Sequence, residues 1–419
     1  MQEQKAWFLL LQVIIKNIKP QTHRKIQSET PKRKNFAEVF FLMRKNVAVI
    51  FGGISCENEI SVITGTMAAN LIDSEKYAVH PVYIAQNGAM YTGEQLRDTA
   101  FFRGADYEKK CSRALLSDGK LYEVRGKKCK EVCPIDCALN CCHGMNGEDG
   151  AVAGLLRLNR IPDASPDMAA SAVFMDKGIT KLVAKALNIP APAFFRISEA
   201  EYKKRGTMAI KCIEERLGYP VIVKPARLGS SIGVAVAEDR AKLAFAIEAG
   251  FAYDTVLIAE KYLADCREIN CAAYRAGDEI VVSACEEPKT DNKFLTFGDK
   301  YIGEGKQRAG DFPAKISKES AERIRGYTKL LYRRMNLRGV VRADFLMAGG
   351  EVYFNEMNTV PGSLAWYLFC DKLADFRGVL TALIEQGIRE FRAQEGKKLL
   401  RNCGVLNGFR PSSGKMRRG

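Results

Sequence analysis

Short apolar runs alternate with amphipathic segments over the first half of the chain. The run NVAVIF at 46–51 leads through a glycine-started loop into ISVITGTMAANLID at 60–73, which carries a helical apolar stripe. Further apolar runs follow at 77–85 and 137–142. Strands that alternate with helices in this way predict an α/β fold with a parallel sheet covered by helices, and ligands bound at the carboxyl ends of the strands.

The pattern changes further along, where strands follow one another through glycine-rich turns. A helical segment ends at the proline-rich turn 190–192, and strand, Gly/Ser loop and strand follow over 219–239. A hairpin at 340–363 and a helix near 374–393 close the pattern. We therefore expect an N-terminal α/β substrate domain (43–165), a central subdomain (166–258) and a C-terminal subdomain (259–393). We expect 1–42 to be a flexible basic extension or an overlong start, and 394–419 to be a basic tail.

Composition fits a folded protein, with 419 residues, 47% hydrophobic residues and mean hydropathy −0.17. The longest apolar stretch, WFLLLQVII at 7–15, is too short to span a bilayer, so we expect a cytoplasmic protein without a membrane partner. The net charge is +15, but +5 of it lies in 1–42 and +7 in 397–419. Because the rest of the chain carries only +3, we expect no nucleic-acid binding by the folded body.

Thirteen cysteines without a secretion signal indicate reduced thiols. Five of them form a cluster, with Cys129, Cys133, Cys137 and Cys141 at intervals of four residues and Cys142 directly after the last. This spacing permits a soft-metal site but lacks the C-x-x-C knuckles of zinc ribbons. The alternative, which we favour, is a strand whose small cysteines pack as apolar residues.

The hairpin at 340–363 carries polar residues at every second position. If Asp344 lies opposite Glu356, Arg342 pairs with Asn358, Leu346 pairs with Phe354, and a three-residue loop remains at 349–351; all six side chains then share one face. Two opposed carboxylates repel unless a cation lies between them, and hard oxygen ligands suit Mg²⁺. The alternative is a solvated face with an Arg–carboxylate pair.

Three other stretches carry candidate chemistry. In VKPARLGSSIGV, Lys224 ends an apolar strand before a Gly/Ser loop, which can close over phosphates or be an ordinary turn. In IAEKYLADCREI, Glu260 and Glu268 flank apolar residues that can hold a base and a ribose. In FGGISCENEIS, Glu57 and Glu59 begin a helix, where an acid either caps the helix or holds a substrate ammonium group.

Seven motifs together resemble those of the D-alanine–D-alanine ligases of the ATP-grasp superfamily, in the same order and over roughly 45–391. The resemblance implies three α/β domains, with ATP held between two α+β subdomains. It also implies ATP-dependent formation of D-alanyl-D-alanine from two D-alanines through an acyl phosphate, for peptidoglycan precursor synthesis, by a homodimer. The motifs are VAVIFGGISCENEIS, HGMNGEDGAVAGLL, MDKGITKLVAKALNIPAP, VIVKPARLGSSIGV, EKYLADCREINCA, DKYIGEG and RADFLMAGGEVYFNEMNTVPGS.

The resemblance also implies roles for individual residues. Glu57 would hold the amino group of the first D-alanine, with His143 nearby and Ser230 orienting Glu57 and Tyr301, while Arg342 and the Gly362 amide would stabilise the oxyanion. Two Mg²⁺ ions, or Mn²⁺, would be bound by Asp344, Glu356 and Asn358. ATP would be contacted by Lys177, Lys224, Ser231, Glu260, Lys261, Leu263, Glu268 and, at the γ-phosphate, Lys300.

The chain departs from the family pattern beyond NTVPG. Where many members place a Ser and a Leu that bind the second substrate, this chain has Tyr367 and Leu368, with Ser363 as a further candidate donor. Tyr301 resembles the aromatic residue of dipeptide-forming members, which favours D-alanine as the second substrate. The alternatives are another acceptor, such as D-lactate, or a basic binding protein that uses the two tails.

Overall fold

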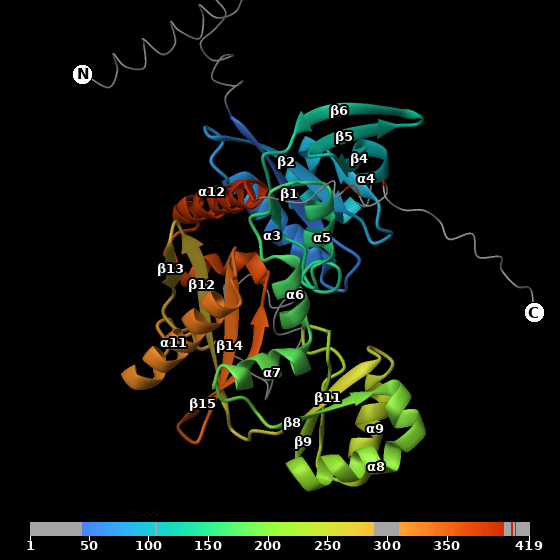
Figure 1. Ribbon diagram of the computed structural model, residues 1–419, viewed down its shortest axis with the longest axis vertical. Coiled ribbons are helices and arrows are strands. Elements are labelled where there is room, and N and C mark those ends of the chain that lie inside the picture. The colour runs from blue at the N-terminus through green and yellow to red at the C-terminus, as the bar shows by residue number, and fades with distance from the viewer. Residues whose placement is uncertain (1–43, 105–106, 289–309, 398–403, 405–406, 408–419) are drawn as a thin grey trace, which may run out of the picture. The chain divides into compact units, whose positions relative to one another are not determined.

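The structure is a computed structural model that describes residues 44–104, 107–288 and 310–397, together with 404 and 407 (Figure 1). The expected extension 1–42, most of the basic tail and most of the loop 288–315 lie outside the described residues, as do Lys300 and Tyr301. Within the described part, no helix has the length and apolar character needed to cross a membrane. The domain boundaries given above stay a prediction.

The first sheet has seven strands in the order β6-β5-β4-β3-β2-β1-β7. Its strands β1, β2 and β7 are parallel, as the sequence predicts, whereas β3 to β6 extend the sheet in antiparallel fashion. The strands are β1 (Lys45–Gly52), β2 (Tyr77–Ile84), β3 (Met90–Thr92), β4 (Ser112–Ser117), β5 (Lys120–Arg125), β6 (Lys128–Pro134) and β7 (Cys137–Asn140). The helical segments here are α3 (Asn58–Leu71), η1 (Glu94–Arg97), η2 (Thr99–Gly104), α4 (Tyr107–Lys110) and α5 (Ala151–Leu158).

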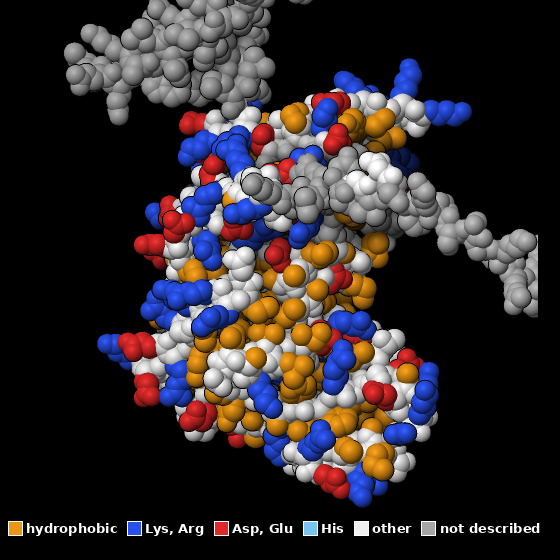
Figure 2. Space-filling view, viewed as in Figure 1, with side chains coloured by type: hydrophobic (Ala, Val, Ile, Leu, Met, Phe, Trp, Pro, Cys, Tyr) orange, Lys and Arg blue, Asp and Glu red, His pale blue; other side chains and the backbone are white. Residues whose placement is uncertain are grey.

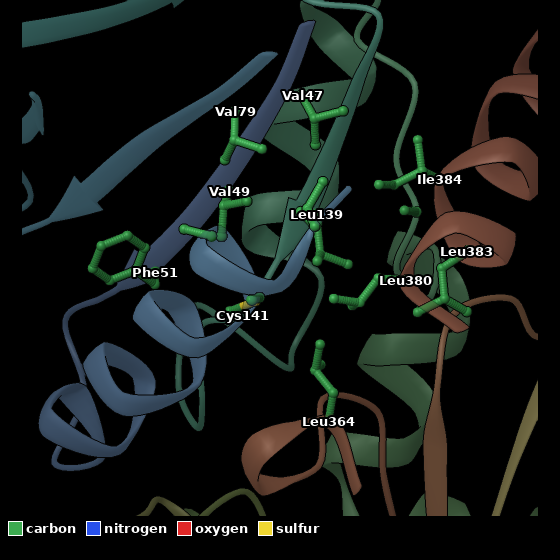
Figure 3. Close-up of a cluster of buried hydrophobic side chains, with 14 of the residues drawn as sticks. Val47, Val49, Phe51, Val79, Leu139, Cys141, Leu364, Leu380, Leu383 and Ile384 are labelled. Carbon is green, nitrogen blue, oxygen red and sulfur yellow. The ribbon is translucent and has the colours of Figure 1, made fainter. Parts of the chain in front are cut away.

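Strand β1 buries both of its faces, because helices cover the sheet on two sides. Val47, Val49 and Phe51 point to one side, where they meet α3 and the last helix, α12 (Phe376–Glu395) (Figure 3). Ala48 and Ile50 point to the other side and pack with α5. A strand buried on both faces reads as a continuous apolar run, which explains the NVAVIF pattern.

The cysteines near β7 behave as apolar residues. Cys137, Cys141 and Cys142 are at most 1% exposed and belong to the two cores of the first sheet. Cys129 is exposed on β6. The packing interpretation is therefore confirmed for the three cysteines of this segment.

The second sheet is antiparallel, in the order β10-β9-β11-β8, and two helices cover one of its faces. On β9, Val221 and Val223 pack against these helices, so that Ile222 and Lys224 face the opposite way. The elements are β8 (Phe194–Ser198), α8 (Glu199–Leu217), β9 (Val221–Pro225), β10 (Ala235–Ala237), α9 (Arg240–Gly250) and β11 (Val256–Lys261).

The third sheet is also antiparallel, in the order β13-β12-β14-β15, and α11 packs on one face. Helix α7 is the helical segment that the sequence predicts before the proline-rich turn, and α6 precedes it. Both helices come before the second sheet in the chain and pack against β15. The elements are α6 (Met168–Met175), α7 (Lys177–Ala186), β12 (Arg267–Ala276), β13 (Glu279–Val282), α11 (Lys318–Arg334), β14 (Val341–Ala348), β15 (Glu351–Asn358), η3 (Gly362–Leu368) and η4 (Leu373–Asp375).

The surface in Figure 2 mixes charges of both signs. Lys and Arg side chains are interspersed with Asp and Glu, so the described side chains form no continuous basic stripe on this face. Apolar side chains gather over the region of α6 and α7, where Met168, Ile179 and Leu182 are exposed.

The hairpin register is partly as predicted. Asp344 lies opposite Glu356 and Arg342 opposite Asn358, but the register shifts directly after Asp344. The predicted Leu346–Phe354 pair and the three-residue loop are therefore wrong. Phe345 pairs with Phe354, and the turn is the two-residue Gly349-Gly350, whose φ angles are +58° and +83°.

The shift is a β-bulge, in which Asn355 is the additional residue of β15. It returns Phe354 to the core side, where the residue is 0% exposed, while Glu356 and Asn358 keep the polar side with Asp344. The bulge lets one strand serve a hydrophobic core at one end and a polar face at the other.

We expect Phe354→Ala to lower the free energy of unfolding by about 3–5 kcal/mol, because it leaves a cavity beside Phe345. Urea unfolding followed by circular dichroism measures this loss. The control is Phe245→Ala, since Phe245 is 74% exposed and its truncation should change stability by less than about 0.5 kcal/mol. Equal losses in the two variants would contradict the assigned core.

Candidate active site

A cavity of about 590 Å³ lies between the second and third sheets. Its walls come from β9 and β11, from the Gly/Ser loop, and from β12, β14 and β15. The structure brings to it every described residue for which the sequence predicts an ATP contact: Lys177, Lys224, Ser231, Glu260, Lys261, Leu263 and Glu268. Residues that lie far apart in the sequence therefore share one concave site.

The wall of this cavity holds a buried carboxylate between two lysines. Glu260 is 1% exposed and lies 2.8 Å from Lys224 and 3.0 Å from Lys181. Burial raises the pKa of Glu260, but the two ammonium groups outweigh it and hold the pKa below its usual range. Glu260 is thus a counter-ion shared by two lysines in the wall of the cavity.

Lys181 is a residue that the sequence analysis missed. Its side chain is fully buried, and burial lowers its pKa although Glu260 opposes that shift. The available signal was its spacing, since Lys177 and Lys181 are four residues apart on α7 and therefore share a face. Because Lys185 follows at the same interval, this spacing is easily taken for a solvated helix face.

The polar hairpin face is balanced by cations. Arg342 donates two hydrogen bonds, of 2.7 and 2.8 Å, to the Asp344 carboxylate, and the Asn358 amide donates a third, of 2.9 Å. Glu356 lies 3.6 Å from the Lys177 ammonium group. The repulsion expected between the two opposed carboxylates is thus offset from both sides, by Arg342 and by Lys177.

Glu57 and Ser230 meet although 173 positions separate them. The Ser230 hydroxyl donates a hydrogen bond to the Glu57 carboxylate, and both residues are buried. Glu57 makes no side-chain capping bond to α3, so the capping interpretation is wrong for this residue, whereas Glu59 is exposed in the first turn of the helix. Because Ser230 also lines the cavity, Glu57 lies at its edge.

His143 is buried and both of its ring nitrogens are engaged. Its Nδ1 lies 2.7 Å from the Val360 carbonyl oxygen, to which it must donate, so Nε2 accepts from the Thr64 hydroxyl at 2.8 Å. Thr64 Oγ1 in turn accepts a hydrogen bond from the Ser363 amide at 3.0 Å. His143 therefore holds the turn after the hairpin, and neither ring nitrogen is left for a substrate.

Glu148, also missed from the sequence, holds the same turn. Its carboxylate accepts hydrogen bonds from the amides of Gly144 (2.9 Å) and Val360 (3.0 Å). Burial, with Glu57 nearby, raises the pKa of Glu148 to about 8. Two side chains from the segment after β7 thus fix the backbone that leads to Gly362.

The segment beyond Gly362 has an unusual backbone. Ser363, Leu364 and Ala365 have φ angles of +50°, +52° and +49°, a left-handed turn that L-residues rarely form. Leu368 is 2% exposed and packs in the core, so its side chain is not available to a substrate. Burial raises the pKa of Tyr367, although the Arg342 guanidinium facing its hydroxyl opposes the shift.

An α/β domain followed by two antiparallel sheets that enclose a lysine-lined cavity is the architecture of ATP-grasp enzymes. The model of the D-ala D-ala ligase N-terminus matches residues 46–165, and that of the D-ala D-ala ligase C-terminus matches 183–388. The chain belongs to the D-alanine–D-alanine ligase family.

Similar proteins cover most of the chain. The D-alanine–D-alanine ligase of Thermosipho africanus is 36% identical over 358 residues, 84% of this chain and 95% of the relative. The crystal structure of the Helicobacter pylori D-alanine–D-alanine ligase has a TM-score of 0.66 and 28% identity, covering 82% of this chain and 98% of that one. VanG, a D-Ala:D-Ser ligase of Enterococcus faecalis, has a TM-score of 0.67 and 26% identity, covering 83% and 99%.

Stability should fall with acid through His143. Burial lowers its pKa from 6.5 to about 4, so the unfolded chain binds the extra proton first. The contribution of the neutral imidazole is complete above pH 6.5 and is lost as pH falls towards 4, by about 3 kcal/mol in all. The contribution is measured as the difference between the urea-unfolding free energies of the wild type and of a variant without an imidazole at this position, between pH 7 and 4.

His143→Gln keeps a hydrogen-bonding side chain but cannot titrate, so it is the matched control. Other groups, Glu148 among them, titrate in both proteins and cancel in the difference. Parallel pH profiles of the two proteins would show that His143 makes no such contribution.

Proposed function

We propose that this protein joins two D-alanines to D-alanyl-D-alanine, with ATP as the phosphoryl donor, for peptidoglycan precursor synthesis. The observation that carries the proposal is the contact between Ser230 and Glu57. It sets a carboxylate suited to a substrate ammonium group at the edge of a cavity that contains lysines for a phosphate chain. Membership in the D-alanine–D-alanine ligase family supports the choice of amino acid.

The chemistry needs these groups because a carboxylate is a poor electrophile. Glu57 holds the ammonium group of the first D-alanine. A carboxylate oxygen of this D-alanine attacks the γ-phosphorus of ATP, which gives an acyl phosphate of D-alanine and releases ADP. Lys177 and Lys224 offset the negative charge of the phosphates. Lys300 is proposed to act on the γ-phosphate in the same way.

The second D-alanine then supplies its free amine. The amine nitrogen attacks the acyl carbon, and the carbonyl oxygen becomes an oxyanion. Phosphate then leaves with the C–O bond electrons and takes up the proton that the nitrogen loses as the amide forms. Arg342 and the Gly362 amide are proposed to stabilise the oxyanion. His143 and Glu148 act indirectly, because they hold the backbone of Val360, which leads to Gly362.

The residues present fit magnesium. Among the described residues, no group of three His, Cys, Asp or Glu side chains could hold a metal ion, so an ion here must take ligands of other kinds as well. Asp344 and Glu356 in register, with the amide of Asn358 beside them, offer hard oxygen ligands that phosphate oxygens can complete. When bound, Mg²⁺ supplies positive charge to the transferring phosphoryl group. Two ions, and replacement by Mn²⁺, are part of this proposal.

The proposal is tested by measuring ADP and phosphate release with purified protein, ATP, Mg²⁺ and one of D-alanine, D-serine, D-lactate, L-alanine or no addition. We expect turnover that depends on D-alanine and D-alanyl-D-alanine as the product detected by mass spectrometry. Turnover without D-alanine dependence would overturn the proposal. A product that contains D-serine or D-lactate in preference would change the second substrate only.

A homodimer is expected by size-exclusion chromatography with light scattering.

Glu356→Gln should lower kcat at least about 100-fold, because the amide removes the negative charge and one of the two carboxylate oxygens from the metal site. The melting temperature should change by only a few degrees, since Glu356 lies at the edge of the cavity rather than in the core. Steady-state rates over a range of Mg²⁺ concentrations measure the effect.

Glu351→Gln on the same strand is the control, since Glu351 is exposed and pairs only with Arg323 among the described residues. It should keep wild-type rates. A fully active Glu356→Gln variant would refute the metal assignment.

A further inference from the structure

The third sheet carries a row of four polar residues, one from each of four neighbouring backbone segments. Glu286 bridges to Asn270, Asn270 pairs with Asp344, and Asp344 pairs with Glu356. Directly paired residues project from the same face of a sheet. Glu286 and Asn270 therefore lie beside the proposed magnesium ligands, and the proposed function gives neither of them a role.

Asn270 has an unmet hydrogen-bonding need. It is 4% exposed, and its Oδ1 has no hydrogen-bond partner among the described residues. A buried acceptor without a donor is unfavourable, and native proteins rarely leave one without a reason. The position calls for a donor that the described chain does not supply.

Glu286, the neighbour of Asn270 in this row, is a buried carboxylate. It is 9% exposed, and burial raises its pKa, although the Arg342 guanidinium and the Asn270 side chain oppose the shift. The Arg342 guanidinium is already held by Asp344 through two hydrogen bonds. A further cation at this point would be favoured by Glu286 and would donate to Asn270 at the same time.

Arg342 and Tyr367 relate the positions of Glu286 and Asn270 to the proposed reaction. Glu286 is within electrostatic range of the Arg342 guanidinium and of the Tyr367 hydroxyl. Arg342 is the group proposed to meet the oxyanion, so the acceptor must bring its nitrogen close to this guanidinium. The carboxylate of Glu286 and the Oδ1 atom of Asn270 lie in the same row as Asp344, which holds this guanidinium.

We propose that Glu286 and Asn270 bind the ammonium group of the acceptor amino acid and so select an amine over a hydroxy acid. An ammonium group brings a positive charge and three donors, which match one carboxylate and one amide oxygen. The hydroxyl of a hydroxy acid brings one donor and no charge, and leaves the buried carboxylate uncompensated. The inference rests on the proposed ligation of two amino acids.

Glu286→Gln tests it with the full-length protein, ATP, Mg²⁺ and D-alanine. The variant keeps the shape but removes the charge, so the KM for D-alanine as acceptor should rise at least about tenfold. In mixtures of D-alanine and D-lactate, mass spectrometry should show a larger share of D-alanyl-D-lactate. The first half-reaction, followed as D-alanine-dependent positional isotope exchange in ¹⁸O-labelled ATP, should stay within about twofold of wild type.

Two further variants keep the test sharp. Glu286→Asp retains the charge and should recover part of the acceptor affinity, which a loss of packing alone would not allow. Glu279→Gln, on the exposed end of β13, should match the wild type. Thermal melting of each variant confirms that the protein is folded.

Three results would overturn the inference. An acceptor KM and a product ratio that are unchanged in Glu286→Gln would show that Glu286 does not contact the acceptor. A shifted Mg²⁺ requirement with an unchanged acceptor KM would assign Glu286 to the metal site instead. A wild-type protein that forms no D-alanine product at all would reject the proposed function and, with it, this inference.

Discussion

The carboxylates of Asp344 and Glu356 lie side by side on two adjacent strands of the third sheet. This pairing imposes the constraint on which the site depends. Two negative charges in register are unfavourable unless cations offset them. The chain meets this need with Arg342 on the same strand and with Lys177 from a helix that precedes the second sheet. Lys177 also donates a hydrogen bond to the Leu228 carbonyl oxygen at 2.6 Å, so the balance of charge at the hairpin extends to the Gly/Ser loop of the second sheet.

The same balance extends into the cavity wall. Glu260 is the shared counter-ion of the buried Lys181 and the partly buried Lys224, and Lys224 also reaches the amide oxygen of Asn355 at 3.4 Å. Asn355 is the additional residue of the bulge, so the irregularity in β15 turns a side chain towards a lysine of the opposite sheet. Bulges beside active sites re-aim side chains in this way. The bulge, the lysines and the carboxylates are therefore parts of one electrostatic arrangement.

How far the sequence predicts this structure depends on the range of the interaction. Period-two alternation gave the pairing of Asp344 with Glu356, because that pattern is local. The same alternation predicts the wrong partner for Phe354, because the additional residue reverses the faces of the positions between it and the turn. The apolar positions 352, 354 and 357 show this shift only once the core is known. Lys181 and Glu286 owe their environment to segments distant in sequence, which no local pattern describes.

The left-handed turn at 363–365 shows why the domains must act together. Non-glycine residues in this conformation cost about 1–2 kcal/mol each, and a turn of three persists only where its surroundings impose it. Thr64, His143 and Glu148 supply that constraint through hydrogen bonds to the backbone of Val360 and Ser363. Thr64 lies on α3, whose N-cap residue is Glu57, whereas His143 and Glu148 lie between β7 and α5. The backbone proposed to meet the oxyanion and the carboxylate proposed to hold the first substrate are thus both held by the N-terminal α/β part of the chain.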